Sequence, residues 1–125
     1  MRLWHYKLIP LLPRQQLLGQ HRECCAMRGK GWGKKHSTVD YVWAYSYQRL
    51  FLYHELVMLE MYKREYKVDP LWYNPLYRGK IIGKDISEFT FVGNFYEMPY
   101  PEHNDQYYQE CIDNLKAKGV VINGS

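Results

Sequence analysis

The sequence lacks the features that define membrane and exported proteins. No apolar run approaches the roughly 20 residues that a membrane span requires. The N-terminal segment contains two cations, Arg2 and Lys7, and short apolar stretches, which are interrupted by Pro10, Pro13 and Arg14. No small-residue cleavage site follows them, so the segment does not resemble a signal peptide. We therefore expect a cytoplasmic protein that has no membrane partner.

Cysteine is scarce and unevenly placed. Of the three cysteines, Cys24 and Cys25 are adjacent and Cys111 is distant, and the sequence contains no C-x-x-C motif. This pattern predicts neither a disulfide framework nor a zinc site, and buried thiols on helix faces are the simpler interpretation. We expect no metal and no cofactor.

Most enzyme motifs are also absent. The chain has no G-x-G-x-x-G at a helix start, no P-loop, no H-E-x-x-H and no G-x-S-x-G. A Cys–His pair stays open as an alternative, although both N-terminal cysteines fall on a stripe that is typical of a core.

Aromatic residues, in contrast, are abundant. They make up 17% of the chain and include 13 tyrosines and 4 tryptophans, which excludes disordered, collagenous and low-complexity classes. A length of 125 residues allows one core, because a second domain would be too small to bury its own. We expect one domain covering residues 1–125.

The net charge of +4 hides an asymmetry between the two parts of the chain. Residues 1–50 carry nine basic and two acidic side chains, a net charge of +7, whereas residues 51–125 carry eight basic and eleven acidic ones. A basic half in a small domain indicates a polyanionic partner, most often nucleic acid. A solvated basic face without a partner explains the same charge.

Hydrophobic periodicity predicts three main helices. The first runs from about Pro13 to Met27, with proline suited to the first turn. The second covers roughly Thr38 to Tyr66, with a possible break at Ser46 as the N-cap of its longer part. The third runs from Asn104 or Asp105 to Lys118. The sequence therefore predicts a compact all-α domain with irregular connections rich in Tyr, Pro and Gly.

The ends of the third helix and the preceding segment carry local signals. Asp105 suits the N-cap and Gly119 suits the stop. Residues 67–100 are rich in Pro, Gly and Tyr, and predict turns, short helical pieces and a strand-like run near residues 89–92.

The first helix has two different faces. One side is mostly apolar and the other mostly polar; the apolar side holds Leu17, Leu18, His21, Cys24, Cys25 and Arg28, and the polar side holds Gln15, Gln16, Gly19, Gln20, Arg22, Glu23 and Ala26. On the polar side, Gln15, Gly19, Arg22 and Ala26 align at helical spacing, so that small side chains alternate with polar ones. A bulky partner could approach this row closely, and a plain solvent face is the alternative.

A glycine-rich basic loop follows the first helix. Residues 28–36 read RGKGWGKKH, with Arg28, Lys30, Lys34 and Lys35 and no acid around a central Trp32. Such a loop can follow a phosphate backbone and offer an aromatic plane to a base. A mobile basic loop without a partner is the alternative.

The second helix is apolar almost all round, which is typical of a central buried helix. His54 lies among its apolar residues, and we interpret it as a core or boundary histidine and not as a ligand. Glu60 and Arg64 form an ordinary i, i+4 surface pair.

Glu23 stands out as an isolated carboxylate in the basic half. An acid beside Arg22 would weaken polyanion binding unless it had a task there. The surrounding residues 14–23, RQQLLGQHRE, resemble the first-helix motif of the pyrimidine-dimer DNA glycosylases with AP-lyase activity, the phage endonuclease V type. The resemblance continues more weakly through the basic stretch ending at His36, the long helix and residues 100–119.

The resemblance implies a compact all-α fold and a specific reaction. Family members attack C1′ of the damaged nucleotide with the N-terminal α-amine, displace the base, and break the strand through an imine and β-elimination. An α-amine suits this task, since its reference pKa of ~7.7–8.0 leaves a neutral fraction at neutral pH. The resemblance assigns Met1 as nucleophile, Glu23 as catalytic carboxylate, and Arg22 and Gln15 as DNA contacts. Arg2 would hold a phosphate and depress the pKa of the amine.

The chain departs from the phage pattern at three places. Residue 2 is a large arginine, which predicts retention of Met1 and a nucleophile displaced by one residue. Ala26 replaces a later arginine of the first helix, with Arg28 nearby. The aromatic C-terminal tail is missing, and Trp72 with Tyr73, or Trp32, are candidates for its role in lesion binding.

These observations lead to one main hypothesis and two alternatives. We expect a DNA repair glycosylase with AP-lyase activity that excises damaged pyrimidines, UV dimers foremost, from double-stranded DNA as a monomer. Its expected DNA contacts are Arg2, Gln15, Arg22, Arg28, Lys30, Trp32, Lys34 and Lys35. The alternatives are a non-catalytic nucleic-acid-binding helical module and a helical structural or regulatory domain that binds no nucleic acid.

The basic loop yields the first testable prediction. Replacing Lys34 and Lys35 by Ala should weaken duplex binding for all sequences and flatten its salt dependence, because two phosphate contacts disappear. Binding titrations over a salt series measure both effects, and unchanged binding would remove the loop from the interface.

Overall fold

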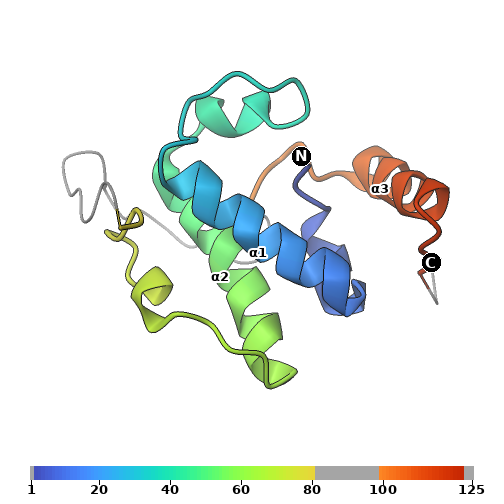
Figure 1. Cartoon of the computed structure of the whole chain (residues 1–125). Helices are drawn as coiled ribbons and strands as arrows, with labels where there is room; N and C mark the ends of the chain where they lie inside the picture. Colours follow the sequence, from blue (N-terminus) through green and yellow to red (C-terminus); the bar gives the residue numbers. More distant parts are fainter. Residues whose placement is uncertain (1, 81–98, 123–125) are drawn as a thin grey trace.

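The computed structural model describes residues 2–80 and 99–122, which form a helical protein (Figure 1). Its three main helices are α1 (Arg14–Arg28), α2 (Tyr47–Lys63) and α3 (Asp105–Ala117). Three short 3-10 helices accompany them. The sequence does not predict η1 (Tyr6–Leu11), whereas η2 (Asp40–Ala44) lies in the region predicted for the second helix and η3 (Pro70–Tyr73) lies where short helical pieces are predicted. The described residues contain no β-strand, so the predicted all-α class with three main helices is confirmed. The strand-like run expected at residues 89–92 lies outside the described residues.

Helices α1 and α2 cross each other and form the centre of the protein (Figure 1). Helix α1 buries Leu17, Cys24 and Met27 in this contact. Ten of the 17 residues of α2 are buried, which confirms its predicted central position. None of the helices within the described ranges is both long enough and apolar enough to cross a bilayer.

The two ends of α2 lie close to the positions predicted from the sequence, but not every predicted contact is present. The predicted break occurs, because η2 ends before Ser46, the N-cap residue of α2. The Ser46 side chain, however, makes no capping hydrogen bond. At the other end, Arg64 pairs with Glu60 at 2.8 Å as predicted, and it also donates to the carbonyl of Leu12 at 2.7 Å. The pair therefore joins η1 to α2 as well as bridging one helical turn.

Helix α3 is held by its capping residues and by the N-terminal segment. Asn104, and not Asp105, is the N-cap, and its side chain accepts a hydrogen bond from the backbone of Tyr107. Asp105 is the first residue of the helix, where its negative charge interacts favourably with the helix dipole. Gly119 has a φ of 84°, the left-handed conformation that ends helices, as predicted.

Residues 2–12 run between α1 and α3 (Figure 1). Tyr107 of α3 donates its hydroxyl to the carbonyl of Leu3. The backbone amide of Tyr6 donates to Nδ1 of His103 at 3.2 Å, and Tyr41 contacts Nε2 of the same ring at 2.8 Å. The N-terminal segment therefore fixes where the C-terminal helix lies.

The buried His103 generates a prediction about acid stability. Burial lowers the pKa of His103 to about 3, whereas the unfolded chain protonates this side chain near 6.5. Since only the unfolded state gains the proton between these values, the free energy of unfolding should fall as the pH drops through this range. The slope contributed by this residue is at most about 1.4 kcal/mol per pH unit.

Urea unfolding between pH 6.5 and 4.5 measures the effect, and His103→Gln is the comparison, because Gln can still accept from the Tyr6 amide. The variant should lose stability less steeply than the wild-type protein as the pH falls. Equal slopes would show that His103 is not the group that titrates.

Candidate active site

Glu23 lies in a cavity between α1, the N-terminal segment and α3. The volume of this cavity is about 300 Å³, at the small end for ligand pockets. Its lining combines a carboxylate, two cations, two uncharged polar side chains and an indole ring; these belong to Glu23, Arg2, Lys118, Asn114, Thr38 and Trp4.

The contribution of α3 is the part of this cavity that the sequence did not reveal. Asn114 and Lys118 lie more than 90 positions after Glu23 in the chain, and no local motif marks them. The only hint is the cluster of lysines at the end of the last helix, which the sequence explains equally well as a helix-dipole effect.

The pKa of Glu23 is raised because the carboxyl group is half-buried. Positive neighbours oppose this effect: the charge of the N-terminal amino group lowers the pKa, as do a hydrogen bond from the Arg2 backbone and the charges of Lys118 and Arg22. A partly buried carboxyl group with a raised pKa in a cavity is a candidate for proton transfer.

Gln20 connects Glu23 to the N-terminal segment. The sequence places Gln20 on the polar outer face of α1, but its side chain is only 1% exposed. Its amide nitrogen donates to Oε2 of Glu23 at 3.1 Å and to the carbonyl of Arg2 at 3.0 Å. The prediction that Gln20 is exposed is therefore wrong. The side chain can be buried because residues of the N-terminal segment, far from it in sequence, satisfy its hydrogen bonds.

Met1, the expected nucleophile, lies outside the described residues. Arg2, which follows it, is half-buried and lines the cavity. One residue spans at most about 3.6 Å of extended chain. The backbone of Arg2 contacts both Gln20 and Glu23, so the attachment point of the N-terminal residue lies at the cavity.

The predicted surface row of α1 is accessible. Gln15, Arg22 and Ala26 are exposed. A Cβ added at Gly19 would meet only the Arg22 guanidinium, at an ordinary distance of 3.8 Å. A partner can therefore approach this face of the helix beside Glu23.

The basic loop divides into exposed cations and a packed indole. Lys30, Lys34 and Lys35 are exposed. Trp32 is partly buried, and its ring packs edge-on against Trp43 and Tyr47 at 4.9 and 5.3 Å. A stacking role for Trp32 stays a prediction.

Arg28 is the predicted DNA contact that the structure contradicts. Its side chain is fully buried and makes five hydrogen bonds, one for each guanidinium N–H. The acceptors are the hydroxyl of Tyr47, Nδ1 of His54 and the carbonyls of Trp72, Asn74 and Tyr77. The guanidinium also lies over the rings of Trp72 and Phe51, at 4.9 and 5.0 Å. No donor is left for a phosphate, so Arg28 holds η3 and the following turn to the core.

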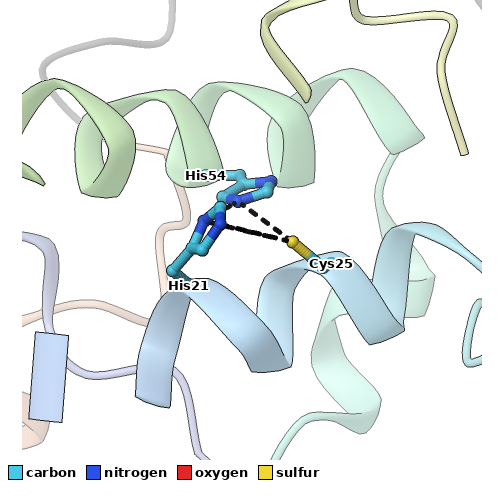
Figure 2. Close-up of side chains that lie close together, drawn as sticks. All are labelled: His21, Cys25 and His54. Carbon is cyan, nitrogen blue, oxygen red and sulfur yellow. Dashed lines mark hydrogen bonds between the residues drawn. The ribbon is translucent and has the colours of Figure 1, made fainter. Parts of the chain in front are cut away.

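His54 is fully buried, which confirms its interpretation as a core histidine. Its ring forms a cluster with His21 and Cys25 (Figure 2). His21 and Cys25 are neighbours on α1, and His54 reaches them from α2. Nδ1 of His21 lies 2.8 Å from Nε2 of His54, and the Cys25 sulfur lies 3.7 Å from Nε2 of His21. These atoms are close enough for a metal site, which the sequence does not predict.

The hydrogen bonds of the cluster argue against a metal ion. A guanidinium can only donate, so Nδ1 of His54 accepts from Arg28 and its Nε2 carries the proton given to His21. The distance of 2.8 Å is that of a hydrogen bond, whereas two nitrogens on one zinc ion stand about 3.3 Å apart. Burial also raises the pKa of the Cys25 thiol to about 12, so the thiol keeps its proton and is not an activated nucleophile.

Fold and cavity together define a small helical protein in which a basic surface surrounds a half-buried carboxylate. The model of the family described as pyrimidine dimer DNA glycosylase matches residues 1–74. This match covers more than half of the chain, and the chain belongs to that family. It is accordingly a DNA repair glycosylase whose substrate is DNA. Neither a curated protein nor a solved structure shows a significant match.

The burial of Arg28 predicts a loss of stability and not a loss of a DNA contact. Arg28→Lys keeps the charge but offers three donors from one nitrogen in place of five from a planar fork. Buried acceptors lose their partners, and the free energy of unfolding should fall by about 3 kcal/mol. Urea unfolding measures this change.

The exposed Arg22→Lys is the control for stability and should stay within about 0.5 kcal/mol of wild type. An Arg28→Lys protein with unchanged stability but weakened DNA binding would contradict the structural role of Arg28.

Proposed function

We propose that the chain excises damaged pyrimidines, UV dimers foremost, and then cleaves the strand as an AP lyase, with the N-terminal amine of Met1 as nucleophile. In this proposal residues 1–125 act as one monomeric domain on double-stranded DNA. The observation that carries the proposal is the shared contact of the Gln20 amide with Arg2 and Glu23. It brings the start of the chain to the one acidic side chain among the residues lining a cationic cavity.

The chemistry follows from these groups. The neutral amine attacks C1′, and the bond from C1′ to the damaged base breaks with the electron pair leaving on the base. Opening of the sugar ring gives an imine, loss of a C2′ proton expels the 3′ phosphate, and water later releases the amine. Glu23 stabilises positive charge on the sugar and imine and accepts the C2′ proton.

The cavity suits a single sugar and its flanking phosphates. Arg2 from the N-terminal segment and Lys118 from the end of α3 supply positive charge to the lining, and Glu23 lies in the same cavity. Because a paired nucleotide is out of reach of such a cavity, the enzyme must bend the duplex and extrude a nucleotide.

The proposed DNA interface extends from the cavity over the exposed face of α1 and the basic loop. Its members are Arg2, Gln15, Arg22, Lys30, Trp32, Lys34 and Lys35. Arg28 is not among them, because all of its donors are used inside the protein.

Borohydride trapping tests the proposal. Wild-type protein incubated with abasic-site duplex and borohydride should form a covalent adduct, because hydride reduces the imine. Glu23→Gln should reduce adduct formation and strand cleavage by about 100-fold or more, while DNA affinity stays equal or rises, since a negative charge near phosphates is removed. Gel analysis of adduct and cleaved strand measures both.

Glu110→Gln, which removes an exposed carboxylate of α3, is the control and should keep wild-type activity. Duplex binding with steep salt dependence but no adduct would contradict the enzyme and support the non-catalytic binding module. A large loss of affinity in Glu23→Gln would make Glu23 a structural residue.

A further inference from the structure

The side-chain amide of Gln20 has every hydrogen-bonding position filled. Its nitrogen donates to the carbonyl of Arg2 at 3.0 Å and to Oε2 of Glu23 at 3.1 Å. Its oxygen accepts from the backbone amide of Trp4 at 2.7 Å and lies 2.9 Å from the hydroxyl of Tyr53, whose single proton it shares with the carbonyl of Trp4 at 2.6 Å. Two donors and two acceptor sites are the full capacity of this group.

This set of contacts allows only one orientation of the amide. A flipped amide would turn its oxygen toward the Arg2 carbonyl and the Glu23 carboxylate, and its nitrogen toward the Trp4 amide and the Tyr53 hydroxyl. Oxygen would then face two acceptors. A buried donor or acceptor without a hydrogen-bond partner costs about 1–3 kcal/mol. The observed orientation of the amide is therefore favoured over the flipped one.

Helix α2 holds the amide from the other side. Tyr53 is fully buried, and its hydroxyl lies 2.6 Å from the carbonyl of Trp4 and 2.9 Å from Oε1 of Gln20. Burial raises the pKa of Tyr53 well above its usual value, so that the hydroxyl keeps its proton and remains a donor. The N-terminal segment is therefore attached at residues 2 and 4 to a point fixed by both central helices.

We propose that Gln20 is a positioning residue that holds the N-terminal amine at its working distance from Glu23 and orients the Glu23 carboxylate. This inference rests on the proposed function, in which these two groups act on one sugar. Gln20 touches neither the sugar nor the reacting atoms. Its contribution is geometric, and a displacement of about 1 Å can cost a catalytic site on the order of 100-fold in rate.

Two substitutions separate positioning from stability. Gln20→Leu removes all four contacts at similar volume. Gln20→Glu keeps the two accepting contacts, to Trp4 and Tyr53, but cannot donate to Arg2 or Glu23 and adds a negative charge beside Glu23. Gln109→Leu, an exposed position of α3 that donates to Asp113, is the matched control.

The first measurement is the single-turnover rate of adduct formation with borohydride and an abasic-site duplex, at saturating protein. Gln20→Leu should slow the rate about 100-fold, with duplex affinity within about threefold of wild type, because the exposed cations of the loop and α1 are unchanged. Gln109→Leu should match wild type. Circular dichroism and urea unfolding confirm that each variant is folded at the assay temperature.

The second measurement is the pH dependence of the same rate in Gln20→Glu, which a purely structural role would not move. Two carboxylates about 3 Å apart cannot both ionise easily, so the pKa of the pair rises. Because the proposed mechanism needs ionised Glu23, the acidic limb of the profile should shift to higher pH by at least about one unit.

The outcomes distinguish this inference from the proposed function. Folded Gln20 variants with wild-type rates and an unshifted profile would overturn the positioning role while the enzyme proposal stands. Absence of an adduct with the wild-type protein would overturn both. A rate loss in Gln20→Leu with a shifted profile in Gln20→Glu supports the inference.

Discussion

The attachment of the N-terminal segment to α1 through the buried amide of Gln20 is the contact on which the rest of the site depends. An N-terminus is ordinarily the least ordered part of a domain unless it is tied down. Here Arg2 and Trp4 bind one side chain in the interior. Leu3 accepts from Tyr107 of α3, and Tyr6 donates to His103, just before that helix. The same segment thus brings its own start to Glu23 and positions the helix that closes the cavity.

Arg28 plays the corresponding part at the other end of α1. A fully buried cation is costly unless its donors are satisfied, and here neutral acceptors from α2, η3 and the following turn meet all five. Its bond to His54 fixes the proton on that ring and, through it, the bond to His21. The cluster with Cys25 is consequently a hydrogen-bond chain inside the protein.

The sequence predicted those features that depend on local patterns. Three helices, the break at Ser46, the stop at Gly119 and the central position of α2 follow from periodicity and from the properties of serine and glycine. The resemblance of residues 14–23 identified the family that the match over residues 1–74 confirms. Of the 3-10 helices, only η1 was missed, because a short turn has no periodic signal; η2 and η3 lie in segments for which helical structure was predicted.

Features that depend on distant partners could not be predicted. Helical spacing places Gln20 on the polar side of the first helix, and Arg28, although on the apolar side, was expected to contact DNA because it begins the basic loop. Their burial is possible only because the segments at Arg2 and Trp72 return to α1 and complete their hydrogen bonds. Lys118 and Asn114 reach the cavity for the same reason, since α3 is held by the N-terminal segment.

The central proposal is that the amine of Met1 forms the covalent bond to the sugar. Its most direct test is proteolysis of the borohydride-trapped adduct followed by mass spectrometry of the peptide that carries the deoxyribose fragment. The account predicts the modification on the α-amine of the N-terminal peptide. A modification on a lysine side chain, such as Lys118 in the same cavity, would contradict it.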